Sequence, residues 1–116
     1  MTEIKDLVKI AVNAIEEKKG YDIKVLNINE ISPLADYFII ATGSNPNQVH
    51  AISDEIQAEL AKEKVYSKQL EGYDKANWIL MDFGDFIIHL FQPETREFYN
   101  LERLWRDAKE EIFSQE

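Results

Sequence analysis

The sequence predicts a single α/β domain that spans residues 1–116, with helices and strands alternating along the chain. Apolar residues recur at helical spacing in three segments, and short runs of β-branched and aromatic residues lie between them. One of these runs is followed at once by a capped helix, an order that favours at least one parallel strand pair. A chain of 116 residues buries roughly two thirds of its unfolded surface, so it can form a core.

The first predicted helix covers residues 2–19, and Gly20 suits the left-handed position after its last turn. Its apolar stripe consists of Ile4, Leu7, Val8, Ala11 and Ile15. Residues 22–28 follow as a predicted strand, because Ile23 and Val25 alternate with polar neighbours.

Residues 37–42 are aromatic and β-branched, which is typical of a buried strand. The next residues launch a second helix, with Ser44 or Asn45 as its cap and Pro46 in its first turn. The apolar stripe of this helix consists of Val49, Ile52, Ile56 and Leu60. A short edge strand is expected at residues 65–67, and Glu71, Gly72 and Tyr73 belong to an exposed turn.

Residues 78–81 and 86–91 are the clearest hairpin in the sequence, and Gly84 in the connection is free to take a positive φ. A two-residue loop at Phe83 and Gly84 would pair Met81 with Phe86. Pro93 ends the second strand and opens a helical region. The last helical stripe is expected to consist of Leu101, Leu104, Trp105, Ala108 and Ile112.

The two faces of this hairpin differ, because side chains alternate across a strand. One face is wholly apolar and is expected to lie under the helices: Ile79, Met81, Phe86, Ile88 and Leu90. The other face mixes aromatic, aliphatic, acidic and imidazole groups: Trp78, Leu80, Asp82, Asp85, Ile87, His89 and Phe91. Such a face suits a protein-binding platform, with an aromatic anchor and a charged rim. The alternative is that Trp78 and His89 pack under another helix.

Charge and composition exclude several kinds of function. The 13 Lys and Arg residues face 22 Asp and Glu residues, a net charge of −9, which disfavours nucleic acid as partner. This charge either suits a basic protein as partner or serves solubility alone. The chain has no cysteine, which excludes disulfides and cysteine-ligated metals and fits a cytoplasmic location. No apolar run approaches the length of about 18 residues that a membrane span needs.

Motifs for catalysis are weak. Gly43 and Ser44 after a strand suggest the opening of a nucleotidyltransferase, for which Asp82 and Asp85 would have to hold divalent metal ions. No third carboxylate for such a site is obvious, and no basic cluster near Gly43 would hold a triphosphate, so we expect no enzyme, no cofactor and no metal site. The aromatic stretch around Phe98 and Trp105 is expected to pack on the sheet, with a second contact region as the alternative.

Four segments together resemble the ribosomal silencing factor family, also called Iojap, in order and spacing over about the whole domain. These segments are residues 35–44, Glu71 with Gly72, residues 78–91 and residues 96–105. The resemblance implies a mixed sheet of about five strands with nucleotidyltransferase-like topology, and we expect the helices on one face. It also implies that the chain binds protein number fourteen of the large ribosomal subunit and blocks subunit joining when nutrients are scarce.

The resemblance also implies a set of partner-binding residues. Combined with the mixed hairpin face, it gives Glu71, Gly72, Tyr73, Trp78, Asp82, Phe83, Asp85 and His89. The chain departs from the family pattern at Phe83, where tyrosine is expected, and at Pro46 and Asn47, where an arginine is common. The second departure weakens any case for nucleotide or RNA contact there, so contact with ribosomal RNA is expected to be incidental. Two other functions stay open: a residual nucleotidyltransferase and a homodimer through the mixed face.

Overall fold

In the computed structural model, which describes residues 3–112, two long helices form where the apolar stripes predicted them. Helix α1 is Ile4–Glu17 and helix α2 is Pro46–Ala61. The predicted start of the first helix at residue 2 lies outside the described residues. Asn45 caps α2 by accepting a hydrogen bond from the Gln48 N–H at 2.9 Å, and Pro46 occupies its first turn, which confirms the predicted capping.

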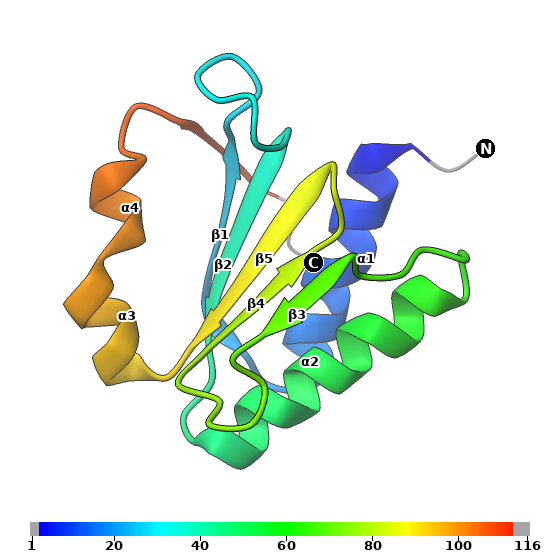
Figure 1. The fold of residues 1–116 in the computed structure, drawn as a ribbon, viewed down its shortest axis with the longest axis vertical. Coiled ribbons are helices and arrows are strands. Elements are labelled where there is room, and N and C mark those ends of the chain that lie inside the picture. The colour runs from blue at the N-terminus through cyan, green and yellow to red at the C-terminus, as the bar shows by residue number, and fades with distance from the viewer. Residues whose placement is uncertain (1–2, 113–116) are drawn as a thin grey trace.

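Six strands form one mixed sheet beside these helices (Figure 1). The strands are β1 (Tyr21–Asn27), β2 (Tyr37–Thr42), β3 (Gln69–Glu71), β4 (Trp78–Asp82), β5 (Phe86–Phe91) and β6 (Lys109–Glu111). Their order is β3-β4-β5-β2-β1-β6, in which β2 and β5 run parallel and the other pairs are antiparallel. The predicted α/β class with a mixed sheet is therefore confirmed, with six strands instead of about five.

The two edge strands differ from the prediction. The expected strand at residues 65–67 is wrong, because the Val65 N–H bonds to Leu60 O at the end of α2 and its side chain packs on the core. Pairing with β4 begins at Gln69. The last helical stripe also fails, because Leu104 is 73% exposed and Ile112 is 88% exposed. The helix ends at Leu104, and residues 109–111 pair with β1 as β6. An edge of the sheet offers these residues backbone partners that an isolated helical turn does not.

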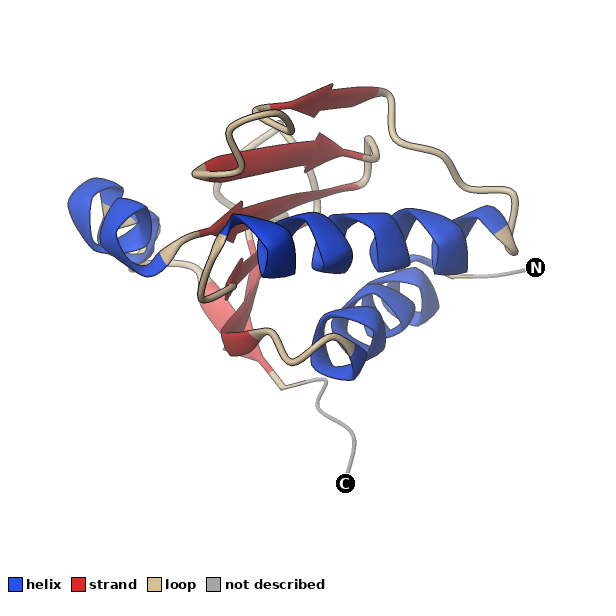
Figure 2. Cartoon of the chain, turned by 90° about the horizontal axis from the view of Figure 1, so that it is seen from below, coloured by secondary structure: helices blue, strands red, loops and turns tan. Residues whose placement is uncertain are grey.

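Helices cover both faces of the sheet, so the expectation of helices on one face is corrected (Figure 2). The side chains of α1 and α2 and one sheet face form the larger core cluster. Two short helices, α3 (Pro93–Tyr99) and α4 (Leu101–Leu104), lie on the other side. There Leu101 packs with Phe38, Ile40 and Phe91 in a smaller cluster. The reason is that Ile40, Phe38 and Phe91 make this second face apolar too, and it has to be covered.

The β4–β5 hairpin has the predicted faces in a different register. Met81 pairs with Ile88 instead of Phe86, a shift of two residues. The Phe83 N–H bonds to Phe86 O at 3.0 Å, so the two-residue loop is Gly84 and Asp85. Gly84 has φ +91°, which suits the first central position of a type II′ turn. A shift of two keeps each side chain on its predicted face.

Candidate functional site

The mixed face extends over three strands on the side of the sheet away from α1 and α2. Directly paired residues of neighbouring strands share a face, so Glu71, Leu80 and His89 form one row across it. The complete set is Gln69, Glu71, Trp78, Leu80, Asp82, Ile87, His89 and Phe91. Its Trp78 end is bordered by α3, as Figure 1 shows. We call these eight residues the mixed face.

Trp78 is half-buried and is fixed on three sides. Its indole Nε1–H donates to Nδ1 of His89 at 3.1 Å. Its ring centroid lies 5.0 Å from that of Phe91 and 4.7 Å from that of Tyr99. Because its hydrogen-bond donor is used inside the protein, Trp78 offers a partner its ring surface only.

His89 is the support beneath Trp78. It is 5% exposed, its ring meets that of Phe38 edge-on at 4.9 Å, and its Nε2 atom has no hydrogen-bond partner among the described residues. Burial lowers the pKa of His89 from 6.5 to about 4. His89 is therefore neutral at neutral pH, with the proton on Nε2, which leaves Nδ1 free to accept from Trp78.

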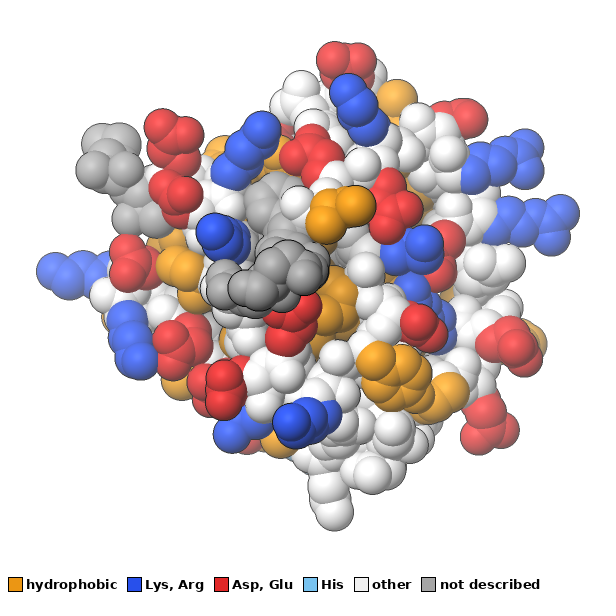
Figure 3. All heavy atoms as spheres, turned by 180° about the vertical axis from the view of Figure 1, so that it is seen from behind, with side chains coloured by type: hydrophobic (Ala, Val, Ile, Leu, Met, Phe, Trp, Pro, Cys, Tyr) orange, Lys and Arg blue, Asp and Glu red, His pale blue; other side chains and the backbone are white. Residues whose placement is uncertain are grey.

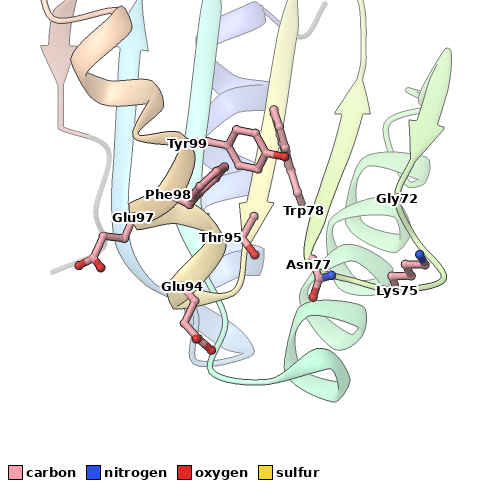
Figure 4. Close-up of a pocket in the computed structure, with 9 residues that line it drawn as sticks. All are labelled: Gly72, Lys75, Asn77, Trp78, Glu94, Thr95, Glu97, Phe98 and Tyr99. Atoms are coloured by element: carbon pink, nitrogen blue, oxygen red, sulfur yellow. The ribbon is translucent and has the colours of Figure 1, made fainter.

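A groove of about 760 Å³ lies between Trp78, the turn after β3, and α3. Figure 4 shows the Tyr99 ring pointing toward Trp78, which it contacts at a centroid distance of 4.7 Å, with Phe98 beside Tyr99 on α3. The lining residues are Gly72, Lys75, Asn77, Trp78, Glu94, Thr95, Glu97, Phe98 and Tyr99. We call this hollow the α3 groove. Its aromatic walls and its size suit side chains of a docked protein segment.

The α3 groove carries more negative than positive charge. Glu94 and Glu97 line it from α3, and Lys75 lies on the opposite turn. On the reverse side of the molecule, acidic and basic side chains are interspersed (Figure 3). The face shown there gathers no cluster of lysine and arginine, the feature that a phosphate backbone would need.

The structure places the residues predicted to bind a partner in different environments. Glu71, Trp78 and Asp82 lie on the mixed face, and Asp85 is exposed at the hairpin turn. Phe83 is 6% exposed and its ring stacks on Phe86 in the core under α1 and α2. An accessible Phe83 was therefore a wrong expectation, because the turn directs its side chain to the helix side.

Tyr73 and His89 are also less accessible than predicted. Tyr73 turns toward α2, where its hydroxyl donates to Asp54 at 2.8 Å. His89 is buried, so it acts beneath the surface through Trp78. Trp78 thus keeps part of its surface accessible although Tyr99 of α3 packs on it, whereas the alternative of burial holds for His89. Partner binding by these residues stays a prediction.

The aromatic residues of α3 are the part that the sequence interpretation placed wrongly. Phe98 was expected to pack on the sheet, but it is 80% exposed, and Tyr99 is 47% exposed. Helix α3 ends at Tyr99 because Asn100 takes a left-handed φ of 49°, which breaks the continuous helical stripe. Asparagine adopts this conformation more readily than most residues, so Asn100 itself was the signal in the sequence that the helix could end there.

Gly72 has a structural role next to Trp78. It has φ +78°, and an added Cβ would collide with the backbone carbonyl of Trp78. We expect Gly72→Ala to lower the free energy of unfolding by about 2 kcal/mol, since both the left-handed conformation and the collision cost energy. Urea denaturation followed by circular dichroism would measure this loss.

Gly84→Ala is the matched control for Gly72→Ala. Gly84 also has a positive φ, of +91°, but an added Cβ there would meet the flexible end of Lys68. We expect Gly84→Ala to lower the free energy of unfolding by about 1 kcal/mol, because alanine there adopts the left-handed conformation without a collision with the backbone. Equal losses for the two variants would contradict the proposed collision with Trp78.

The residues suspected of nucleotidyl transfer do not meet. Gly43 adjoins Phe91 at one end of β5, and Asp85 lies next to Phe86 at the other end. Six residues of strand separate the two groups by about 17 Å. The loop before α2, residues 43–45, is explained by helix capping, since the Ser44 N–H donates to the side-chain oxygen of Gln48. The part of the chain that the structure describes holds no group of three His, Asp or Glu residues able to bind a metal ion.

No helix within residues 3–112 is long and apolar enough to cross a membrane. The residues that remain as a candidate site are those of the mixed face and the α3 groove. Their half-buried aromatic anchor, exposed aromatic wall and acidic rim match a protein-binding surface.

Comparisons with known proteins agree with this interpretation. The family model for "ribosomal silencing factor during starvation", RsfS, matches residues 1–116. The ribosomal silencing factor RsfS of Halalkalibacterium halodurans is 42% identical over 103 residues, 89% of this chain and 88% of the relative. A mouse protein named mitochondrial assembly of ribosomal large subunit protein 1 is 33% identical over 101 residues, 84% of this chain and 44% of its own.

A solved structure shares the fold. The crystal structure of a Chromobacterium violaceum protein superposes with a TM-score of 0.88 at 32% identity, covering 99% of this chain and 95% of the other. The predicted architecture is thus found in an experimental structure of similar sequence.

Proposed function

The chain belongs to the RsfS family of ribosomal silencing factors, and we propose that it binds the large ribosomal subunit and sterically blocks joining with the small subunit. The family implies ribosome-associated regulation of translation. The proposed partner is protein number fourteen of the large subunit, on the face that meets the small subunit, and the proposed location is the cytoplasm. Repression of translation would follow from this occupancy, and the proposed condition of nutrient limitation comes from the description of the family.

The observation that carries the proposal is the fixed, accessible ring of Trp78 at the edge of the α3 groove. Trp78 is held by His89 and Tyr99, so a partner meets it without reordering it. A rigid aromatic anchor beside a concave surface is the usual centre of a protein interface. The exposed Phe98 and Tyr99 extend the apolar area beyond the sheet.

Charge supports a basic partner. The chain has a net charge of −9, and Glu71, Glu94 and Glu97 border the proposed docking surface. Carboxylates at the rim of an interface steer a basic protein and suppress wrong partners. The same charge repels phosphate backbones, so contact with ribosomal RNA is incidental in this proposal.

The proposed mechanism makes and breaks no covalent bond. A domain whose Cα atoms extend 34 × 33 × 30 Å, bound at the joining face, occupies space that the small subunit would need. In this proposal, silencing requires only that the chain binds the large subunit tightly and that it binds at the joining face. The separation of Gly43 from Asp85 argues against nucleotidyl transfer as the alternative.

Sedimentation tests the proposal directly. The purified chain would be mixed with isolated large subunits, then with small subunits, and each mixture separated on a gradient. We expect the chain to co-sediment with large subunits and the fraction of joined ribosomes to fall. Free chain at the top of the gradient with joining unaffected would overturn the proposal. Light scattering of that free chain would then show whether the mixed face forms a homodimer instead.

A further inference from the structure

Helix α3 is attached to the rest of the fold in an uncommon way. Of its seven residues, all of which the structure describes, Arg96 is the one that is buried. A helix of seven residues is too short to be stable by itself and is normally held by an apolar face. Here the buried side chain is a cation, so polar contacts must hold the helix.

The Arg96 guanidinium contacts three separate elements. Its Nη1 donates to Thr42 Oγ1 at 2.7 Å and to the backbone carbonyl of Asp22. Its Nε and Nη2 donate to one carboxylate oxygen of Glu102 at 3.2 and 2.8 Å. Thr42 ends β2, Asp22 lies near the start of β1, and Glu102 belongs to α4. We call Arg96, Thr42, Asp22 and Glu102 the clasp.

The backbone is shaped to complete the clasp. The register of β1 against β2 is irregular between Tyr21 and Lys24, and Asp22 within this bulge has a φ of +51°. A bulge redirects the groups of a strand, and here the carbonyl of Asp22 meets Arg96. Asn100, with a φ of +49°, turns the chain so that α4 places Glu102 beside Arg96. Two left-handed residues other than glycine persist where their surroundings fix them.

The clasp is ionic at neutral pH. Burial acts to raise the pKa of Glu102, but the hydrogen bond and the positive charge of Arg96 outweigh it, and the pKa ends below its usual value. Hydrogen bonds between two ionised groups are shorter and stronger than neutral ones.

The clasp and Tyr99 together determine where α3 lies. Tyr99, three residues after Arg96, contacts Trp78 at a ring centroid distance of 4.7 Å. Phe98 and Tyr99 are otherwise exposed, so their own burial does not position them. We propose that Arg96 is a positioning residue, which holds α3 through the clasp so that Tyr99 and Phe98 form the α3 groove opposite Trp78. The link to ribosome binding rests on the proposed function, whereas the link to Trp78 does not.

Trp78 fluorescence tests the proposal in the isolated protein. In a Trp105→Phe background, emission comes from Trp78 alone. We expect Arg96→Gln to shift this emission to the red and to raise its acrylamide quenching constant about twofold, because Tyr99 no longer covers the ring. Arg96→Lys should restore these values in part, since one ammonium reaches some of the acceptors but not all. Arg103→Gln, an exposed arginine on α4, is the matched control and should behave as the parent.

Binding to large subunits is the second measurement. We expect Arg96→Gln to raise the Kd five- to tenfold with little change in far-UV circular dichroism. Unchanged Trp78 emission in Arg96→Gln would overturn the proposal. If Arg96→Gln fails to fold, Glu102→Gln weakens the clasp alone, and unchanged Trp78 emission in that variant would overturn the proposal equally. If emission shifts as expected but the parent chain does not co-sediment with large subunits, the clasp stands and the proposed function fails.

Discussion

Trp78→Ala is expected to weaken binding to the large ribosomal subunit at least about 30-fold, the effect of losing an interface anchor worth about 2 kcal/mol. The ring of Trp78 is the accessible end of an aromatic cluster that includes His89, Phe91 and Tyr99. Its removal takes away both the contact area and the wall of the α3 groove. Titration of fluorescently labelled chain with large subunits would give the two dissociation constants.

Trp105→Ala is the control for this substitution. Trp105 is a second half-buried tryptophan, and it packs edge-on against Phe38 at 4.9 Å, away from the α3 groove. Its loss should lower the free energy of unfolding and leave the Kd for large subunits within about twofold, because Trp105 packs on the smaller cluster but, unlike Trp78, does not line the α3 groove. Equal weakening by both substitutions would show that Trp78→Ala acts through stability, and the docking surface would have to be sought elsewhere.

Acid is expected to destabilise the protein through His89. Its pKa is about 4 in the folded chain and about 6.5 when unfolded, because burial disfavours the imidazolium. Between these values the unfolded chain binds more protons than the folded chain, so stability falls as the pH falls from 6.5 to 4. The full loss is about 3 kcal/mol, at about 1.4 kcal/mol for each pH unit.

His89→Asn isolates this effect from the titration of carboxylates. The side-chain oxygen of asparagine can accept from Trp78 Nε1 in place of Nδ1, and it does not titrate. The pKa of Glu102 is lowered in both proteins, so its protonation at lower pH lowers the free energy of unfolding equally in both. Denaturant titrations at pH 7, 6, 5 and 4 should show a steeper decline in the parent than in His89→Asn. Parallel declines would mean that the pKa of His89 is not lowered in the folded chain.

The hairpin shows what alternation can and cannot predict. Which side chains share a face depends on a period of two, so Trp78 and Asp82 were placed together although the pairing was wrong by two residues. The pairing depends on the turn, and Gly84 could serve more than one loop length. The accessible tryptophan therefore followed from sequence, and its neighbours across the strands did not.

The C-terminal region was harder to predict for a different reason. Leu101 and Trp105 do pack on the sheet, as a helical stripe indicates. The break at Asn100 and the pairing of β6 with β1 depend on distant residues, which local spacing does not report. The same applies to Arg96, because two of its three acceptor residues lie 54 and 74 residues away along the chain. A surface arginine and a clasp arginine look alike in sequence.

The parallel pairing of β2 with β5 governs when, during synthesis, the chain can become active. Tyr37 pairs with Phe86 across 86 − 37 = 49 residues, so the centre of the sheet closes only after both hairpin strands have been made. The groove wall on α3 comes later still, and the clasp requires Glu102. While Glu102 is still inside the ribosomal exit tunnel, the nascent chain has no complete docking surface. If the proposed function holds, the chain therefore cannot engage a large subunit through this surface until Glu102 has left the tunnel.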